Sequence, residues 1–235
     1  MASTVIKNWD NDTWLSSKDY IESFNKFLTK KIKLNSRSKI LDIGCGRGKI
    51  LGNLSSKLRL KNKPLGTDIT NHKDKDKRIK FKKINASRFF YKNQNKFDLI
   101  LIKQMIHLLN LNEIKRLLIL CKKNLNQNGK ILIFTLDNDK NELPTFKLMK
   151  TKLKKSLKRD KKILKLITTL FLCKKSKFVY KVNMSKKKYS RMIQKRFIST
   201  LLPLTNKELK KGMSEINYKY KKNIKFSDKL ICLTL

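Results

Sequence analysis

Apolar residues recur at helical spacing near the start of the chain. Ser16 is followed three residues later by Asp19, a spacing typical of a helix N-terminus. The apolar residues that follow repeat at i, i+3, i+4 and i+7, and they are Tyr20, Ile21, Phe24, Phe27 and Leu28. The pattern predicts a helix with one buried stripe, placed ahead of the first strand.

Strand-like and helix-like segments then alternate as far as residue 136. Strands are predicted at 39–43, 63–68, 79–84, 97–102 and 130–136. Helices are predicted at 47–58, 86–92 and 112–124, with a charged loop at 71–77. Parallel strands need crossover connections, which are usually helical, so the alternation predicts an α/β fold with a mostly parallel sheet.

The remainder of the chain interrupts this alternation. Between residues 144 and 176 the pattern predicts one long or two short amphipathic helices, because these residues recur at helical spacing: Phe146, Met149, Leu153, Leu157, Leu164, Ile167 and Phe171. Beyond this segment, strands are predicted at 178–184 and 229–235, and helices at 186–194 and 206–220.

Three glycines at alternate positions follow the first strand directly. They are Gly44, Gly46 and Gly48, and a helical apolar pattern begins just after them. Glycine tolerates positive φ and lets the backbone approach a ligand, and a helix N-terminus offers unpaired N–H groups. The dinucleotide fingerprint would need glycine at position 49, where this chain has Lys49. An acidic residue, Asp68, ends the next strand.

This turn and its acidic partner resemble motif I and strand 2 of the class I S-adenosylmethionine-dependent methyltransferases. Asn85 and Ala86 are similar to the family's D-A element after strand 3, with Asn in place of Asp. Residues 97–109 resemble its strand 4 and the segment that follows, and residues 125–133 resemble its turn into strand 5. The close resemblance covers about residues 37–136.

The resemblance implies a Rossmann-like seven-stranded sheet of order 3-2-1-4-5-7-6, with strand 7 antiparallel and helices on both faces. One methyltransferase domain is expected over residues 1–235. Its parts would be an N-terminal helical segment at 1–36, a cofactor-binding core at 37–143, a basic helical insertion or lid at 144–176, and strands 6 and 7 with their helices at 177–235.

The resemblance also implies S-adenosylmethionine as cofactor. The three glycines, with Cys45 among them, would let the backbone approach the methionine moiety. Asp42 would position its ammonium, Asp68 would accept hydrogen bonds from the ribose hydroxyls, and Ile69 would pack on the adenine.

Four more residues would complete the cofactor site. Asn85 and Ala86 would lie at the adenine edge, and Lys103 and Gln104 would line the methyl end of the donor. A cation beside a sulfonium is unfavourable unless it points toward an anionic acceptor.

His107 lies just past the fourth strand, where open α/β sheets place their ligands. It is the candidate catalytic base, and packing against the sheet is the alternative. Arg47, in the glycine turn, would bind the methionine carboxylate or face water. The second histidine, His72, lies in the charged loop and is expected to be exposed. With two separated histidines, no metal site is predicted.

The chemical class of the methyl acceptor is inferred mainly by excluding nucleobases. Residues 102–105 lack the D/N-P-P-Y/F tetrapeptide of exocyclic-amine methyltransferases, and no Pro-Cys dipeptide marks a cytosine C5 nucleophile. The layout resembles small-molecule methyltransferases, including those of the trans-aconitate type that act on carboxylates. The basic residues Lys188, Arg191 and Arg196 would then hold an anionic acceptor.

Aromatic residues near the N-terminus offer a second acceptor-side hypothesis. Trp9, Trp14 and Tyr20 would either close over the donor as a lid or be ordinary packing of the first helix, and Trp14 is a candidate contact for the acceptor.

The charge balance adds an open question. Lys and Arg number 59 against 17 Asp and Glu, a net charge of +42, and only nine of the 59 are Arg. Twenty basic residues and a single acid fall between positions 147 and 196. Either an acidic partner or codon drift in an A+T-rich genome explains this excess. An RNA methyltransferase, or a non-catalytic basic binding protein on the same fold, is therefore the alternative function; nucleic acid is a possible partner that the sequence does not favour.

Cysteine usage and hydropathy bear on the compartment. The four cysteines lie far apart with no C-x-x-C pair, which favours a reducing, cytoplasmic location without disulfides or zinc. The first 14 residues contain no apolar core of a signal peptide. The longest apolar run, 163–173, is interrupted by Lys165 and is too short to span a membrane.

Overall fold

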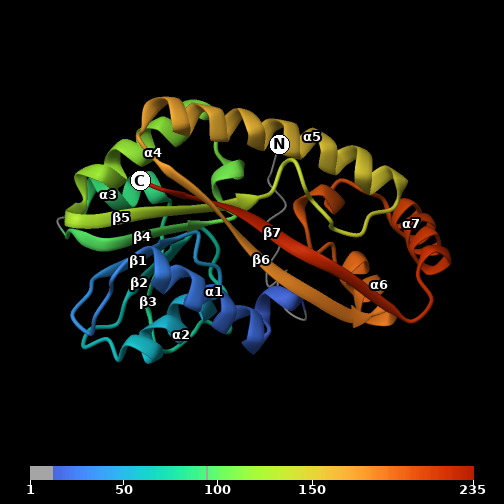
Figure 1. The fold of residues 1–235 in the computed structure, drawn as a ribbon, viewed down its shortest axis with the longest axis horizontal. Helices are drawn as coiled ribbons and strands as arrows, with labels where there is room; N and C mark the ends of the chain where they lie inside the picture. The colour runs from blue at the N-terminus through green and yellow to red at the C-terminus, as the bar shows by residue number, and fades with distance from the viewer. Residues whose placement is uncertain (1–12, 94) are drawn as a thin grey trace.

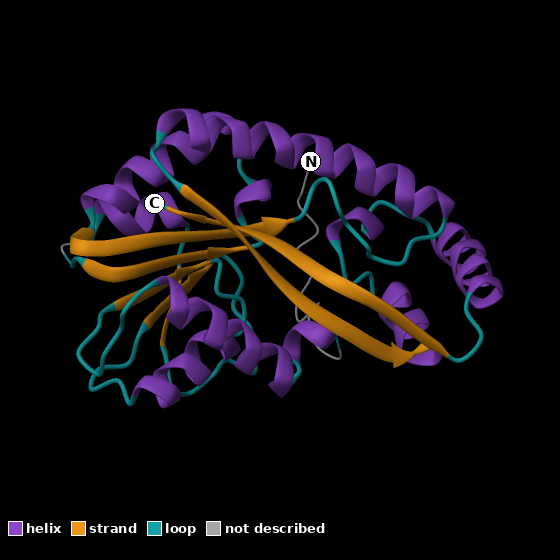
Figure 2. Ribbon diagram, in the orientation of Figure 1, coloured by secondary structure: helices purple, strands orange, loops and turns teal. Residues whose placement is uncertain are grey.

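The computed structural model describes residues 13–93 and 95–235 and has one seven-stranded sheet at its centre (Figures 1 and 2). The strands are β1 (Ile40–Ile43), β2 (Leu65–Asp68), β3 (Lys80–Lys83), β4 (Phe97–Lys103), β5 (Leu125–Leu136), β6 (Lys174–Ser185) and β7 (Asn223–Thr234). Their order is β3-β2-β1-β4-β5-β7-β6, and β7 runs antiparallel to both of its neighbours. The predicted sheet order and the antiparallel seventh strand are confirmed.

Helices cover both faces of the parallel part of the sheet. One core contains Ile40 and Leu99 together with α1 (Lys18–Lys31) and α2 (Lys49–Leu58). The other core contains the next strand residues, Leu41 and Ile100, with α3 (Ala86–Tyr91) and α4 (Leu111–Lys123). Because side chains alternate along a strand and both faces are buried, these strands have nearly continuous apolar runs.

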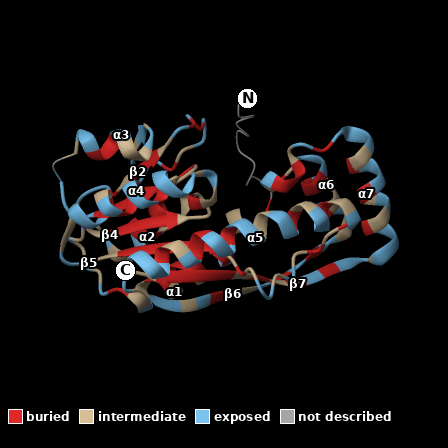
Figure 3. Ribbon diagram, turned by 90° about the horizontal axis from the view of Figure 1, so that it is seen from above, coloured by how far each residue is buried: buried red, intermediate tan, exposed pale blue. Residues whose placement is uncertain are grey.

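The basic segment after β5 forms a single long helix, α5 (Lys147–Leu170), which confirms the first of the two predicted alternatives. Met149, near its start, packs in the first core, while Ile163 and Ile167 pack with α4 in the second. Figure 3 shows buried and exposed positions alternating along the helix. None of the described helices is apolar over a length that could cross a membrane.

Strands β6 and β7 are longer than predicted. Only residues 230–234 of β7 pair with β5, so the rest of β7 and the far half of β6 form a two-stranded ribbon beyond the sheet. Figure 1 shows α6 (Lys186–Gln194) and α7 (Asn206–Lys219) at the far end of this ribbon. The predicted β7 was too short because an acid, Asp228, occupies one of its inward positions. The other inward residues there are apolar, so the acid hides the alternation of polar and apolar residues that marks a strand.

Two other predicted boundaries are wrong by a few residues. The N-cap of α1 is Ser17, whose Oγ accepts a hydrogen bond from Tyr20 N at 3.3 Å, while Ser16 belongs to the short 3₁₀ helix Trp14–Ser16. β5 begins at Leu125, because this residue pairs with Phe97 before the register shifts.

Candidate active site

The turn after β1 has the backbone conformation that its glycines predict. φ is +71° at Gly44, +55° at Gly46 and +70° at Gly48, all in the left-handed region. The N–H groups of Gly44 and Cys45 donate to Thr67 O at 2.8 and 3.0 Å, which fastens the turn to β2. A Cβ built on Gly46 would meet no atom within 4 Å. The backbone at Gly46 therefore borders open space, which suits close approach by a ligand.

Asp68 links this turn to the end of β2. Its Oδ2 accepts a hydrogen bond from Gly46 N at 2.9 Å, and its Oδ1 accepts one from Thr70 N at 2.8 Å. A carboxylate has about four acceptor positions, so it can accept further hydrogen bonds from a ligand. Ile69, next in the chain, has 57% of its surface exposed, which is unusual for isoleucine and leaves an apolar face beside the carboxylate.

The sheet brings Asn85 and Ala86 to the same place. Ile84 N donates to Asp68 O at 2.9 Å, so the residues after β3 lie beside the end of β2. Asn85 caps α3, and its Oδ1 accepts a hydrogen bond from Ser87 N at 2.9 Å. The structure thus gathers the residues that the sequence assigned to the adenosine half of the cofactor.

Asp42 is a buried carboxylate at the end of β1. Its Oδ1 has no hydrogen-bond partner in residues 13–93 and 95–235. Burial raises the pKa of Asp42 to about 8; Lys103 acts in the opposite direction, and Asp68 raises it further. A buried carboxyl group with one unpaired oxygen is suited to a cationic ligand group.

Lys103 is the last residue of β4, the other neighbour of β1, and Gln104 follows it. The Lys103 Nζ donates to Gln104 Oε1 at 3.2 Å and lies 5.3 Å from the ring centroid of Tyr20 and 5.5 Å from that of Phe24. Gln104 has a φ of +51°, a strained conformation for a residue with a side chain. Such strain is concentrated at functional sites, and here it lies at the edge of the sheet that holds the glycine turn.

The charged loop 71–77 packs on the glycine turn. Arg47 is only 7% exposed; its Nη1 donates to Asp74 Oδ2 at 2.8 Å, and its carbonyl accepts from Asp76 N at 2.9 Å. The alternative in which Arg47 faces water is therefore wrong. The prediction that His72 is exposed is also wrong, since its side chain is only 5% exposed. The contacts of Arg47 with Asp74 and Asp76 hold the loop against the turn and so bury this histidine.

Cys45 contributes its backbone to the turn, while its thiol packs inward. The Sγ atom would lie 2.7 Å from a Cβ on Gly66 of β2. Burial raises the pKa of Cys45, and the carboxylates of Asp42 and Asp68 raise it further, so the thiol stays protonated. Across the two described ranges, no cluster of three or more His, Cys, Asp or Glu side chains is arranged to hold a metal ion.

His107 lies in the 3₁₀ helix Ile106–Leu108, just after β4. Burial lowers the pKa of His107 to about 4, and the positive charge of Arg159 lowers it further. The imidazole is therefore neutral at neutral pH, a state compatible with either a catalytic base or a packed side chain.

This shift predicts a pH-dependent stability. Because the folded pKa lies below the usual value of about 6.5, the stabilisation from neutral His107 is complete above pH 6.5 and is lost as the pH falls toward 4. We expect His107→Gln to reduce the fall in unfolding free energy over that window by up to about 1.4 kcal/mol per pH unit. Urea denaturation at half-unit pH steps would measure it, and parallel curves for the two proteins would contradict the shift.

Asp228 of β7 is a buried acid that the sequence did not single out. It is 5% exposed, and its Oδ2 accepts a hydrogen bond from Trp14 Nε1 at 3.1 Å. Burial raises the pKa of Asp228, while the hydrogen bond from Trp14, the charge of Lys103 and Tyr20 lower it. The inward alternation of β7 is the sequence signal that could have revealed it.

Trp14 itself is packed, at 6% exposure, edge-on against Phe197 and Phe226 at centroid distances of 5.6 and 5.1 Å. This agrees with the packing alternative, and contact with an acceptor remains a prediction. Trp9, the other proposed lid residue, lies outside the described residues.

Arg196 is held within the connection between α6 and α7. Its Nη2 donates to Leu204 O and to Asn206 Oδ1, both at 3.0 Å, and its φ is +50°. The structure therefore gives Arg196 a positioning role in this connection, and its proposed role toward an acceptor remains a prediction.

Known proteins share both the motif region and the fold. Residues 41–133 match a family model described as a methyltransferase domain. No curated protein matches the sequence.

Three solved structures illustrate the shared fold. A protein described as a methyltransferase from an antibiotic biosynthesis pathway of Anabaena variabilis aligns with a TM-score of 0.62 at 13% identity, over 90% of this chain and 96% of that chain. The plantazolicin methyltransferase BpumL, in complex with SAH and a pentazolic desmethylPZN analog, aligns with a TM-score of 0.51 at 18% identity, over 97% and 88%. Precorrin 8W decarboxylase of Methanobacterium thermoautotrophicum aligns with a TM-score of 0.51 at 10% identity, over 90% and 88%.

The sheet order, the glycine turn with its acidic partners, and the family match together define a class I methyltransferase fold. Residues 41–133 match a methyltransferase domain, and S-adenosylmethionine is the methyl donor that such a domain implies. The open space at Gly46 and the unpaired Oδ1 of Asp42 fit this donor.

Proposed function

We propose that this enzyme transfers the donor's methyl group to a small-molecule acceptor that carries an anionic group. Lys103 is the observation that carries the proposal. Its ammonium lies at the end of β4, against two aromatic rings, where it acts electrostatically on both Asp42 and Asp228. A second cation beside the sulfonium of the donor is unfavourable, so its place is best explained by an anion that binds there with the donor.

The donor would lie along the ends of β1 and β2. Its ammonium would pair with Asp42, its methionine chain would pass Gly46, and its ribose hydroxyls would donate to Asp68. Ile69 would cover one face of the adenine, and Asn85, with the alanine after it, would lie at the adenine edge. This arrangement rests on the exposure, open space and unpaired oxygen described above.

S-adenosylmethionine supplies an already activated methyl group, so the protein mainly has to align the acceptor and exclude water. The strained end of β4 would hold Lys103 and Gln104 at the methyl end of the donor. A carboxylate acceptor has no proton to lose and would need no base. An acceptor with a proton on its nucleophile would need one, and neutral His107 is the candidate.

The donor site is tested by isothermal titration with S-adenosylmethionine and S-adenosylhomocysteine. We expect Asp68→Asn to weaken both ligands by at least about tenfold, because the amide cannot accept from two hydroxyls as the carboxylate does. Asp139→Asn is the matched control, since its carboxylate is exposed and pairs only loosely with Lys161 at 3.5 Å. Unchanged affinity in Asp68→Asn, or no binding to the wild type, would contradict the proposal.

RNA is the second candidate acceptor, and the charge of α5 is the observation that favours it. Nine lysines and one arginine lie on this helix, and its single acid, Asp160, is buried. Contacts of lysines with phosphates would give an RNA affinity that falls steeply with salt concentration. Small-acceptor turnover that varies little between two salt concentrations would favour the first candidate.

A further inference from the structure

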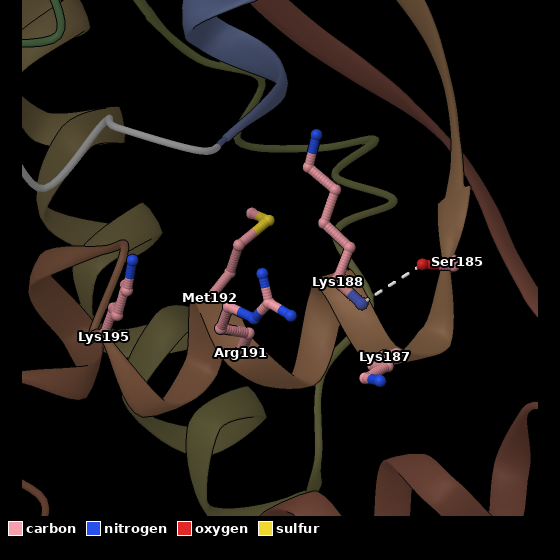
Figure 4. Close-up of a pocket in the computed structure, with 6 residues that line it drawn as sticks. All are labelled: Ser185, Lys187, Lys188, Arg191, Met192 and Lys195. Atoms are coloured by element: carbon pink, nitrogen blue, oxygen red, sulfur yellow. Dashed lines mark hydrogen bonds between the residues drawn. The ribbon is translucent and has the colours of Figure 1, made fainter.

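A basic pocket lies on α6, away from the donor-binding turn. It is about 350 Å³ in volume, and its lining comes from this helix and the two residues that flank it: Ser185, Lys187, Lys188, Arg191, Met192 and Lys195. Figure 4 shows Lys188, Met192 and Lys195 projecting from the same side of the helix. The volume is within the range of pockets that bind small molecules.

The helix is fixed by its buried side chains. Tyr189, Met192 and Ile193 are buried, and the Tyr189 hydroxyl donates to Pro144 O at 2.5 Å. Met192, at 2% exposure, therefore forms a rigid floor for the pocket. The cations consequently stand around a concave surface with a fixed base, which distinguishes them from lysines scattered on a solvated helix face.

The charges of this pocket oppose one another. Lys187, Arg191 and Lys195 are spaced four residues apart, and like charges at that spacing destabilise a helix. The first turn of α6 contains three lysines and no acid, although the positive end of the helix dipole favours anions there. Lys187, Lys188 and Arg191 form no ion pair with any carboxylate of residues 13–93 or 95–235.

A bound anion would relieve all of these unfavourable terms together. Arg191 presents a planar fork that can donate two hydrogen bonds to one oxyanion, and the lysines add point charges around it. We propose that this pocket is an anion-binding site for a phosphate or carboxylate group of a small molecule.

Aromatic contacts connect this helix to the methyl-transfer site. The rings of Tyr189 and Phe197 lie 5.6 Å apart, and Phe197 in turn contacts Trp14, which donates to Asp228. The anion would accordingly be a second charged group of the methyl acceptor, at the end away from Lys103. This second step rests on the proposed function, whereas anion binding itself does not.

The test is calorimetric titration of the full-length protein with pyrophosphate and with citrate, in the absence of donor. The pocket variant is Lys187→Gln/Lys188→Gln/Arg191→Gln. Its matched control is Lys207→Gln/Lys210→Gln/Lys211→Gln, which removes three exposed charges from α7. We expect at least one probe to bind the wild type with a stoichiometry of one. Its affinity for the pocket variant should be at least tenfold weaker, and its affinity for the control should be within twofold of that for the wild type. Comparing the two probes separates phosphate from carboxylate preference.

Thermal melting provides the second measurement. Without anion, the pocket variant should melt at or above the wild-type temperature, because repulsion on α6 is removed, and the probe should raise the melting temperature of the wild type and the control only. Equal weakening in both triple variants, undiminished binding in the pocket variant, or no binding of either probe to the wild type would overturn the proposal.

The acceptor assignment has its own readout. For an acceptor found among anionic metabolites, the pocket variant should raise KM at least tenfold with kcat and donor affinity unchanged, and an unchanged KM would overturn the assignment. Failure of the methyltransferase function would instead appear as absent donor binding in the wild type, whatever the probes do.

Discussion

Replacing Asp42 by asparagine should stabilise the free protein and nearly abolish its binding of S-adenosylmethionine. The pKa of this carboxyl is raised to about 8, chiefly by burial. A raised pKa means that its contribution to stability is fully present below about pH 4, and is lost as the pH rises toward 8. At pH 7 the folded protein therefore bears most of the cost of burying this acid.

The neutral amide avoids this cost. Allowing for the amide's own burial, we expect Asp42→Asn to be more stable at pH 7 by about 2 kcal/mol, or about 5 °C in Tm. Differential scanning calorimetry at pH 5 and pH 7 would measure the difference, which should shrink at the lower pH.

The binding effect has the opposite sign. A carboxylate that pairs with an ammonium in a buried site contributes strongly, so the amide should weaken S-adenosylmethionine binding by about 100-fold. Wild-type affinity should also rise with pH up to about 8, because Asp42 must lose its proton before it can pair. Titration in two buffers of different ionisation enthalpy would show the proton release. Wild-type affinity in Asp42→Asn, with Asp139→Asn as control, would place the ammonium elsewhere.

Alanine at Gly46 and at Gly44 should separate ligand binding from folding. Both residues have positive φ, where alanine costs roughly 1 kcal/mol or slightly more. At Gly46 the new methyl group enters open space. We therefore expect Gly46→Ala to lose only about 1 kcal/mol of stability while it binds the donor at least tenfold more weakly, because the methyl group fills the space where the methionine chain would pass.

At Gly44 the methyl group meets the protein itself. The Cβ would lie 2.6 Å from Met105 Cγ and 2.8 Å from Met105 Cβ. Overpacking and backbone strain together should cost about 3 kcal/mol, or roughly 10 °C in Tm. Melting curves and donor titrations on the two variants check this contrast. Equal donor affinity in Gly46→Ala and the wild type would show that no ligand group occupies the space at Gly46.

The parallel half of the fold could be predicted from sequence because its signals are local. Each strand there is a short apolar run, and each connecting helix has its own periodicity, so most boundaries fell within two residues. The candidate donor site could be predicted equally well, because glycines at alternate positions and an acid at the end of the next strand can be recognised without knowledge of distant contacts.

The remainder depends on contacts between distant residues. The burial of Asp228 could not be predicted locally, because its hydrogen bond comes from Trp14, more than two hundred positions earlier in the chain. Arg47 and His72 are polar residues near a charged loop, and only the folded loop buries them. The basic pocket likewise needs α6 to be fixed by Pro144, whose contribution is a backbone carbonyl without a side-chain signal.

The position of β7 has a consequence for the order in which the protein assembles. This strand comes last among the described elements, yet it lies between β5 and β6 in the sheet. During synthesis, β5 therefore presents an unpaired edge, and β6 has no partner in the sheet, until β7 leaves the ribosome. The donor-binding half can fold while the chain is still growing, but the platform that carries α6 and α7 forms only after β7 has emerged, so a chain that stalls before β7 would expose an unpaired sheet edge that is prone to aggregation.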